Sequence, residues 1–166
     1  MKARLRFLWQ TGEQVRLLIA WSRLLSRIPL IGRPLSLLTD NMLLYFYGIE
    51  LTSTSLDIDR LVIGHSTGVV LGGNGIRCTG TLHIASGVVF ARRYAARDSE
   101  AEHFFDIKGD LTVGANSVLL GPLKIRGPVT VGALTLVSHD ILEPGTYIGQ
   151  PARRLERGAG PAPEQG

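Results

Sequence analysis

The chain has 166 residues, of which 45% are apolar and 20 are glycine, so it is long enough for one domain with a sizeable core. This composition fits a turn-rich β protein and excludes a disordered chain. The formal net charge is +4, and the lone Cys78 excludes an internal disulfide and fits a reducing cytosol.

The N-terminal segment, residues 1–47, carries the positive charge. Its lysines and arginines outnumber its acidic residues, which are only Glu13 and Asp40, while the rest of the chain is close to neutral. Apolar residues recur between the arginines at roughly helical spacing, which predicts two or three short helices between about residues 3 and 46. Pro29 and Pro34 interrupt the pattern.

Two interpretations of this helical segment stay open. The helices can cap one end of the β structure that follows and cover its edge. Basic amphipathic helices with Trp9 and Trp21 also suit an anionic membrane surface. No apolar run approaches the roughly 20 residues that span a bilayer, and the start of the chain is a poor signal peptide. We therefore expect a cytoplasmic protein, with a possible peripheral position at the inner face of the membrane.

A period of six marks the C-terminal half of the chain. This spacing fits neither an α-helix nor an alternating strand, and it is typical of a left-handed parallel β-helix built from hexapeptide repeats. Three hexads make one triangular coil, and one residue of each hexad points inward. Gly114 and Gly132 follow inward residues, where we expect a positive backbone φ. The inward residues predicted by the regular repeat are Ile107, Val113, Leu119, Ile125, Val131 and Val137.

The β-helix is predicted to begin near Leu51, with less regular coils. Asp57 breaks the apolar pattern there, and Ile58 is the expected substitute. The second series is shifted by one residue, which predicts a one-residue bulge within residues 71–75. The inward residues expected in these coils are Leu51, Ile63, Val69, Ile76, Leu82 and Val88.

The remaining segments are charged or rich in turn-forming residues. Residues 91–106 are aperiodic and predict a loop that leaves one corner of the prism. The expected organisation is a helical segment at 1–47, a β-helix domain at 48–156 and a disordered tail at 157–166.

Metal chemistry is not expected. The four histidines are His65, His83, His103 and His139, and no two of them are closer than 18 residues. There is no cysteine pair and no HxxxH motif. We interpret His83 and His139 as surface residues.

Two short motifs point to a known group of enzymes. Residues 47–51 read YGIEL and residues 62–72 read VIGHSTGVVLG, so that Glu50 and His65 stand 15 apart. Residues 148–153 read IGQPAR. Together these resemble the serine acetyltransferase group of hexapeptide-repeat acyltransferases, over about 110 residues. The resemblance implies an acetyl-CoA-dependent O-acetyltransferase.

Histidine and a carboxylate suit acetyl transfer to an alcohol. A base must take the hydroxyl proton as the oxygen attacks the thioester, and a histidine typically contributes roughly 10²–10⁴-fold in rate. A carboxylate on the other ring nitrogen orients the imidazole and stabilises its charged form. His65 is the candidate base and Glu50 its partner, with a corner histidine and a surface carboxylate as the structural alternatives.

The resemblance also implies further site residues. His103 lies where the serine enzymes have a second active-site histidine, and either it holds the acceptor or it is an ordinary loop residue. Coenzyme A is expected along a groove between subunits of a homotrimer. The residues that match its binding positions are Ala115, Ala133, Gly149, Pro151 and Arg153.

Two departures bear on the acceptor. The serine enzymes have an aspartate before the first histidine and an arginine before the second, and the resemblance assigns both to serine. Here those positions are Gly64 and Glu102. A shorter branch that acetylates sugars, of the exopolysaccharide or colanic acid type, matches the short N-terminus and Glu50 better. The sequence therefore favours a sugar or lipid-linked sugar hydroxyl, with serine O-acetyltransferase and a non-catalytic scaffold as alternatives, and no nucleic-acid partner.

Overall fold

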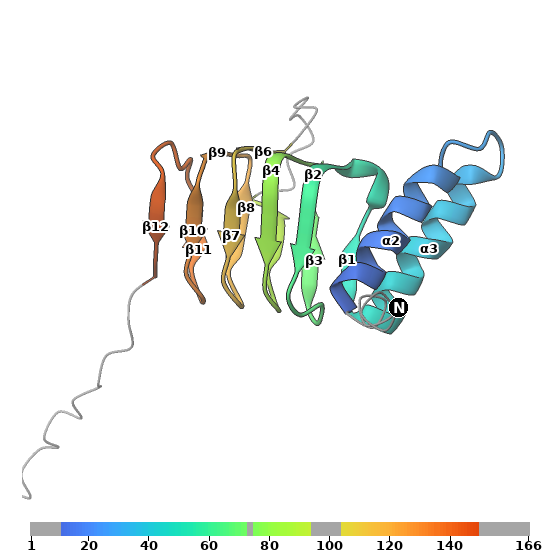
Figure 1. Ribbon diagram of the computed structural model, residues 1–166, viewed down its shortest axis with the longest axis horizontal. Helices are drawn as coiled ribbons and strands as arrows, with labels where there is room; N and C mark the ends of the chain where they lie inside the picture. The colour runs from blue at the N-terminus through green and yellow to red at the C-terminus, as the bar shows by residue number, and fades with distance from the viewer. Residues whose placement is uncertain (1–10, 73–74, 94–103, 150–166) are drawn as a thin grey trace, which may run out of the picture.

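The computed structural model describes residues 11–72, 75–93 and 104–149, which form two helices followed by a stack of β-strands (Figure 1). The helices are α2 (Thr11–Leu25) and α3 (Gly32–Tyr47), and a 3-10 turn, η1, covers Ser53–Ser55. The strands are β1 (Ile49–Leu51), β2 (Leu56–Ile63), β3 (Val69–Leu71), β4 (Ile76–Ile84), β5 (Val89–Arg92), β6 (Phe105–Lys108), β7 (Leu111–Val113), β8 (Val118–Gly121), β9 (Leu123–Arg126), β10 (Val129–Val131), β11 (Leu136–Val137) and β12 (Gly145–Tyr147).

The two helices form a hairpin at the β1 end of the stack (Figure 1). Pro29 lies in the connection between them, as the sequence predicts, but Pro34 does not interrupt a helix: it lies in the first turn of α3, where a proline is tolerated. Gly48, whose φ is +65°, caps the C-terminal end of α3. Neither helix in the described residues has the length and apolar content needed to cross a bilayer. Their place at the end of the stack supports the interpretation of these helices as a cap.

A buried polar cluster fastens this hairpin to the β structure. Asp40 accepts hydrogen bonds from the Ser22 hydroxyl at 2.9 Å and from the Ser53 backbone N–H at 3.0 Å, and also from the Ser53 hydroxyl. The hydroxyls of Ser22 and Ser36 lie 2.8 Å apart. Because buried polar atoms are costly without partners, this cluster holds α2, α3 and η1 in one arrangement.

All the strand pairs are parallel, and their registers define three ladders. The first ladder runs β1–β3–β5–β8–β11. The remaining strands form a second sheet around β4. The first half of β4 pairs with β6 and its second half pairs with β7, so this sheet divides into two faces of the prism. The second ladder joins residues 56–58, residues 76–79, β6 and β9, and the third joins residues 60–63, residues 81–84, β7, β10 and β12.

The chain therefore visits three faces in turn before it stacks on itself, as the hexads predict. Leu111 pairs with Val129, and Val118 pairs with Leu136, so each coil of the regular repeat takes 18 residues, or three hexads. The predicted parallel arrangement is confirmed, whereas the left-handed sense of the winding stays a prediction.

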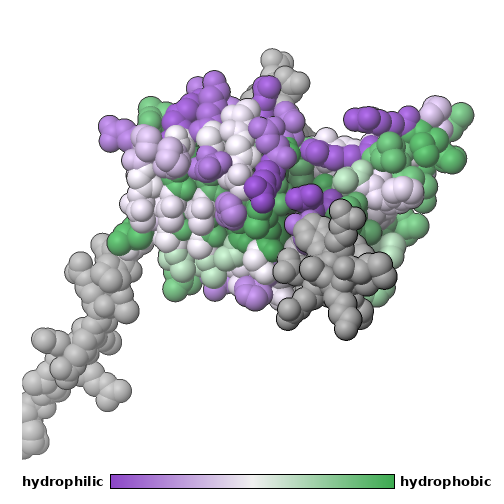
Figure 2. Space-filling view, viewed as in Figure 1, coloured by the Kyte–Doolittle hydropathy of each residue, from purple (hydrophilic) through white to green (hydrophobic). Residues whose placement is uncertain are grey.

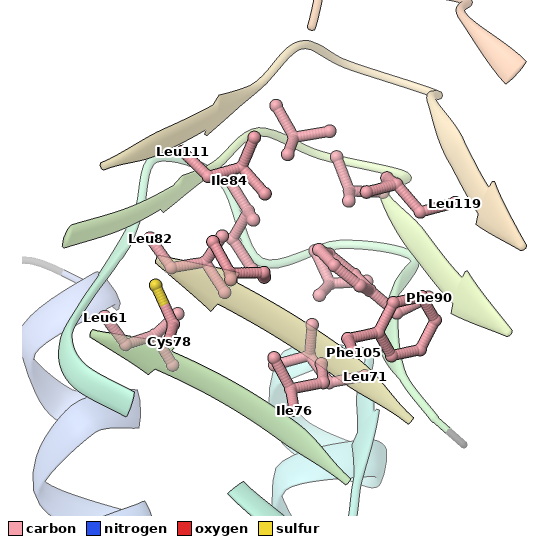
Figure 3. Close-up of a cluster of buried hydrophobic side chains, with 14 of the residues drawn as sticks. Leu61, Leu71, Ile76, Cys78, Leu82, Ile84, Phe90, Phe105, Leu111 and Leu119 are labelled. Carbon is pink, nitrogen blue, oxygen red and sulfur yellow. The ribbon is translucent and has the colours of Figure 1, made fainter. Parts of the chain in front are cut away.

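The core fills the space between the three ladders. All twelve inward residues predicted from the sequence are buried, with exposed fractions between 0% and 8%. Figure 3 shows Leu71, Phe90, Leu119 and Phe105 converging in this interior. One prediction was wrong: Leu56, 3% exposed, is the buried residue of its segment, and Ile58 is only half-buried. The hexad count misses this because this segment of the first coil is out of phase with the repeat.

The predicted extra residue in the second coil is present. Leu71 and Ile76 are five apart, whereas Leu119 and Leu123, which share their registers two coils later, are four apart. One more residue therefore lies between Leu71 and Ile76 than in the regular repeat. A second irregularity, in the pairing of β2 with β4, occurs between Ile58 and Arg60.

The predicted loop at 91–106 is shorter than expected at both ends. Ala91 and Arg92 continue β5, and Phe105 and Asp106 begin β6. The rings of Phe104 and Phe105 are buried and 5.6 Å apart, in an edge-to-face arrangement. The charged composition of the segment conceals this aromatic anchor. Residues 94–103 lie outside the described residues.

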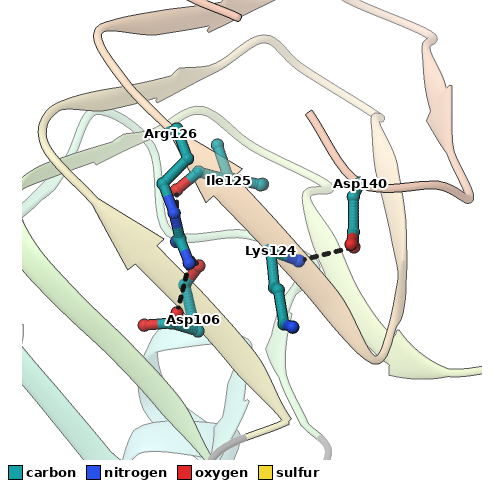
Figure 4. A network of polar contacts seen from close by, with 5 residues as sticks. All are labelled: Asp106, Lys124, Ile125, Arg126 and Asp140. Atoms are coloured by element: carbon teal, nitrogen blue, oxygen red, sulfur yellow. Dashed lines mark hydrogen bonds and ion pairs between the residues drawn. The ribbon is translucent and has the colours of Figure 1, made fainter. Parts of the chain in front are cut away.

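Polar side chains link neighbouring coils on the outside of the prism (Figure 4). Arg126 of β9 donates to a carboxylate oxygen of Asp106 in β6 at 2.7 Å and to the Asp106 backbone oxygen at 2.9 Å. Asp140 accepts the backbone N–H of Lys124 at 2.8 Å. These contacts fix the spacing of coils along the second ladder.

The corners between the third and first ladders share one backbone feature. Each has a residue in the left-handed region at the same register position: Gly68 (φ +72°), Gly87 (+66°), Asn116 (+57°) and Leu134 (+55°). Gly48 (+65°), between α3 and β1, has the same register position in the first coil. The positive φ predicted at Gly114 and Gly132 therefore falls two residues later. Gly114 is required for a different reason, because a Cβ there would lie 2.5 Å from the Ala133 nitrogen.

Leu134 is the poorest fit to this column of left-handed residues. A leucine pays a steric cost in that region that asparagine largely avoids, and the side chain is 76% exposed, so little burial is lost on replacement. We expect Leu134→Asn to stabilise the protein by about 0.5–1 kcal/mol, which is roughly 1–4 °C in melting temperature. Thermal unfolding of the two proteins checks this, and a lower melting temperature for the variant would contradict it.

Candidate active site

The candidate site is built on the corners that join the third ladder to the first. Backbone hydrogen bonds stack these corners in register: Gly64 N–H to Ile84 O (2.9 Å), Ala85 N–H to Val113 O (3.1 Å), Gly114 N–H to Val131 O (2.8 Å) and Gly132 N–H to Tyr147 O (2.8 Å). The same register gives one equivalent position to His65, Ser86, Ala115, Ala133 and Gly149. We call this set the corner column. The predicted base and three predicted donor-binding residues thus follow one edge of the prism.

The corner that carries His65 is longer than the others. Ile63 pairs with Ile84, and Leu71 pairs with Phe90. Ile63 and Leu71 are eight residues apart, whereas their partners Ile84 and Phe90 are only six apart. Two extra residues therefore lie in the first corner. His65 is exposed there, between the ends of β2 and β3. A longer corner gives the imidazole room that the tight corners do not offer.

Glu50 lies beside this corner on the outer side of β1. The burial pattern of β1 turns Ile49 and Leu51 inward and leaves Glu50 exposed, in register with Val70 of β3. The Gly68 N–H donates to the Gly48 oxygen at 3.0 Å, which fastens the His65 corner to the start of β1. Within the described residues, no hydrogen bond or ion pair joins Glu50 to His65. Their pairing stays a prediction.

Small residues and two hydroxyls shape the other end of the column. Ala115 and Ala133 occupy tight turns, and the Leu134 N–H donates to the Ala115 oxygen at 2.9 Å. Ser117, fully buried, donates to the Gly132 oxygen at 2.7 Å and accepts the N–H of Thr135 at 3.2 Å. The Gly149 N–H is in turn bonded to the Thr135 hydroxyl at 2.9 Å.

Sequence reasoning missed these two hydroxyls. Ser117 and Thr135 fix the backbone on which the predicted donor-binding residues stand, so they support the site without being exposed to a ligand. Their spacing of 18 residues, one full coil, is the signal that could have found them.

Several predicted residues lie outside the described ranges of the chain. His103, Pro151 and Arg153 are among them, so their roles stay predictions. His83 and His139 are exposed, as expected of surface histidines. No group of three or more His, Cys, Asp or Glu side chains in residues 11–72, 75–93 and 104–149 is arranged to hold a metal ion.

Two cavities lie away from the corner column, beside the helical hairpin. One, of about 410 Å³, opens between α2 and β2 and includes Arg16, Arg23 and Arg60 in its wall. The other, of about 400 Å³, lies beside α3 and η1 and includes Arg33 and Asp40. Neither is lined by a predicted catalytic or donor-binding residue.

Cys78 is a core residue and not a nucleophile. Its side chain is 1% exposed among the inward residues of the prism (Figure 3). Burial, followed by the nearby carboxylates of Asp59 and Asp110, raises the pKa of the thiol to about 11. The thiol therefore stays protonated at neutral pH, when thiol chemistry needs the thiolate.

This raised pKa predicts a pH dependence of stability. The folded chain holds the thiol proton more tightly than the unfolded chain, in which the pKa is about 8.5. The stability that this provides is complete below that value and is lost as the pH rises towards about 11. We expect the unfolding free energy of the wild type to fall more steeply between pH 9 and 11 than that of Cys78→Ala. Equal slopes in urea titrations would contradict this.

Comparison with solved structures finds serine acetyltransferases that are similar to this chain. The chain is similar to soybean serine acetyltransferase complexed with serine, with a TM-score of 0.58 and 26% identity over 82% of this chain and 54% of that one. It is similar to serine acetyltransferase from Neisseria gonorrhoeae, with a TM-score of 0.56 and 27% identity over 86% and 54%. The chain thus spans about half the length of these two enzymes.

A third solved structure supports the fold alone. Serine acetyltransferase isoform 3 from Entamoeba histolytica, in complex with cysteine, matches with a TM-score of 0.56 and 16% identity over 86% of this chain and 60% of that one. No protein-family model matches the sequence, and no curated protein does. These three structural neighbours are serine acetyltransferases, and the likeness to sugar acetyltransferases stays a prediction.

Proposed function

We propose that the protein is an acetyl-CoA-dependent O-acetyltransferase built on a left-handed β-helix, with His65 as its general base. The observation that supports this most is the corner column, in which one edge of the prism carries His65 and the predicted donor-binding residues in register. The likeness to two serine acetyltransferases at 26% and 27% identity supports the same activity class.

The reaction needs one proton moved twice. The acceptor oxygen attacks the thioester carbonyl while the imidazole of His65 takes the hydroxyl proton. The carbon–sulfur bond breaks, the proton passes to the departing sulfur, and the products are an O-acetyl ester and free coenzyme A. In this proposal Glu50 orients the imidazole and stabilises its charged form. Catalytic hydrogen bonds are often loose in a free enzyme, so the exposed position of both side chains is compatible with that role.

The donor would lie along the small residues of the column. Ala115 and Ala133 leave the backbone accessible, and Gly149 continues that line. Pro151 and Arg153 follow in the sequence, and a guanidinium can bond to coenzyme phosphates. Leu136 and Ile148, near this end, are 60% and 72% exposed. A neighbouring subunit of a homotrimer would cover such apolar residues and close the groove.

The acceptor is proposed from two observations that differ in weight. Comparison favours L-serine, because the similar soybean enzyme is complexed with serine. A sugar hydroxyl is the second candidate. Gly64, directly before His65, is exposed and has no side chain with which to bind an amino group. We therefore place L-serine first and a sugar hydroxyl second.

One assay separates these acceptors from each other and from a scaffold without catalysis. Release of free thiol from acetyl-CoA is measured with L-serine, and separately with nucleotide-linked and lipid-linked sugars. Turnover with serine supports the first candidate, and turnover with sugars alone supports the second. A scaffold would show neither turnover nor a rise in melting temperature with coenzyme A, since only a specific ligand stabilises by mass action.

A further inference from the structure

The helical hairpin of α2 and α3 exposes most of the large apolar side chains on the described surface. Of 17 large hydrophobic residues exposed among the described residues, 13 lie between Leu17 and Phe46. On α2 they recur on one face at Leu17, Trp21 and Leu24, which are 51%, 56% and 55% exposed. Surface patches of this size on a folded protein mark an interaction site.

The exposure of apolar side chains is clearest in the loop at the free end of the hairpin, residues 26–31. Figure 1 shows this loop pointing away from the β-strands. Leu30 is 100% exposed, and its neighbours Ile28 and Ile31 are 42% and 61% exposed. The backbone of Leu30 adopts φ +71°, a region that costs a leucine roughly 1–2 kcal/mol. The loop thus holds apolar side chains outward at an energetic cost.

The charges around this loop have one sign. From residue 20 to residue 38 the charged side chains are Arg23, Arg27 and Arg33, without an acid. The nearest acid in sequence, Asp40, is 7% exposed and is occupied by hydrogen bonds from Ser22 and Ser53. Figure 2 shows apolar surface at the hairpin end of the molecule, close to hydrophilic residues.

The combination of apolar and basic residues on the hairpin favours an anionic membrane over a second copy of the chain as its partner. A two-fold contact with a second copy, centred on this loop, would bring Arg27 and Arg33 of both chains close together, and like charges repel. An anionic bilayer accepts both features, because apolar side chains enter the acyl boundary and each arginine near the surface adds attraction.

We propose that the hairpin docks the protein on an anionic membrane surface, with the loop at 26–31 entering the interface. Leu30, Ile28 and Ile31 provide the apolar contact, and Arg27 and Arg33 contact lipid phosphates. The buried cluster around Asp40 keeps the hairpin fixed to the prism, so docking orients the whole β structure. This inference does not depend on the proposed acetyl transfer.

The test uses the full chain and vesicles of phosphatidylcholine with or without phosphatidylglycerol. We expect sedimentation with the anionic vesicles, a blue shift of Trp21 fluorescence in a Trp9→Phe background, and weaker binding at high salt. Leu30→Asn keeps a residue that tolerates positive φ and should weaken partitioning about tenfold. Arg27→Gln with Arg33→Gln should have a similar effect.

The matched control is Leu134→Asn. Leu134 is also exposed and also has positive φ, but it lies beside the corner column, at the far end of the prism from the hairpin, so its replacement should leave vesicle binding unchanged. The proposal is overturned if the wild type does not bind anionic vesicles, or if Leu30→Asn and the double arginine variant bind as tightly as the wild type. It is equally overturned if Leu30→Asn changes only the mass of the soluble assembly in light scattering, which would assign the patch to a second copy.

Discussion

Replacing His65 with alanine should lower the turnover of acetyl-CoA by roughly 10²–10⁴-fold, because the acceptor hydroxyl then loses its base. His65 is exposed in a corner, outside the core, so the folded structure should not change. The measurement is thiol release under saturating donor, together with the melting temperature of the variant. A rate within a factor of a few of the wild type would remove His65 from the mechanism.

His83 provides the matched control for this experiment. It is an exposed histidine on the outer side of β4, outside the corner column, so His83→Ala should leave turnover unchanged.

Glu50→Gln tests the positioning role of Glu50, because it keeps the shape of the side chain but removes its charge. We expect a lower kcat with little change in KM for the acceptor, by a smaller factor than for His65→Ala.

Replacing the buried Phe105 with alanine should strongly lower the free energy of unfolding. Its ring is 0% exposed and lies edge-to-face with Phe90, with the ring centroids 5.1 Å apart. Removing a buried phenylalanine costs about 3–5 kcal/mol, because contacts are lost and a cavity remains. We expect the melting temperature to fall by about 10 °C.

Phe46 is the control for this second variant. It is also a phenylalanine, but it is 75% exposed on α3, and its replacement by alanine should change the unfolding free energy by no more than about 0.5 kcal/mol. Comparable destabilisation of the two variants would show that the burial of Phe105 does not determine its contribution.

The repeat itself could be predicted from the sequence because the geometry leaves little choice. Each face of a coil must bury a residue against its counterpart in the next coil, so residues from Ile107 to Val137 show the period of six directly. The first coils are less regular, and Leu56 was missed because hydrogen bonding to the next coil, rather than the count of residues, sets its register.

The candidate site could be predicted only to a limited extent. The motif around His65 identified a residue, but not the two-residue lengthening of its corner, which becomes visible only when Ile63 and Leu71 are compared with their partners. The sequence predicts a positive φ at the glycines after inward positions. In fact the close approach of the next coil requires Gly114, and the positive φ falls on Asn116. Such contacts between successive coils depend on distances that a single sequence does not contain.

The last coil of the prism is weakly paired, so a bound acetyl donor is expected to stabilise it. The final strands are short: β11 has two residues, and in the second ladder the end is held by the single bridge between Ile125 and Ile141. In a stack whose units touch only their neighbours, such a terminal unit frays first. Gly149 belongs to that end, so a molecule seated there would suppress fraying, and slower amide exchange around Tyr147 would report its arrival.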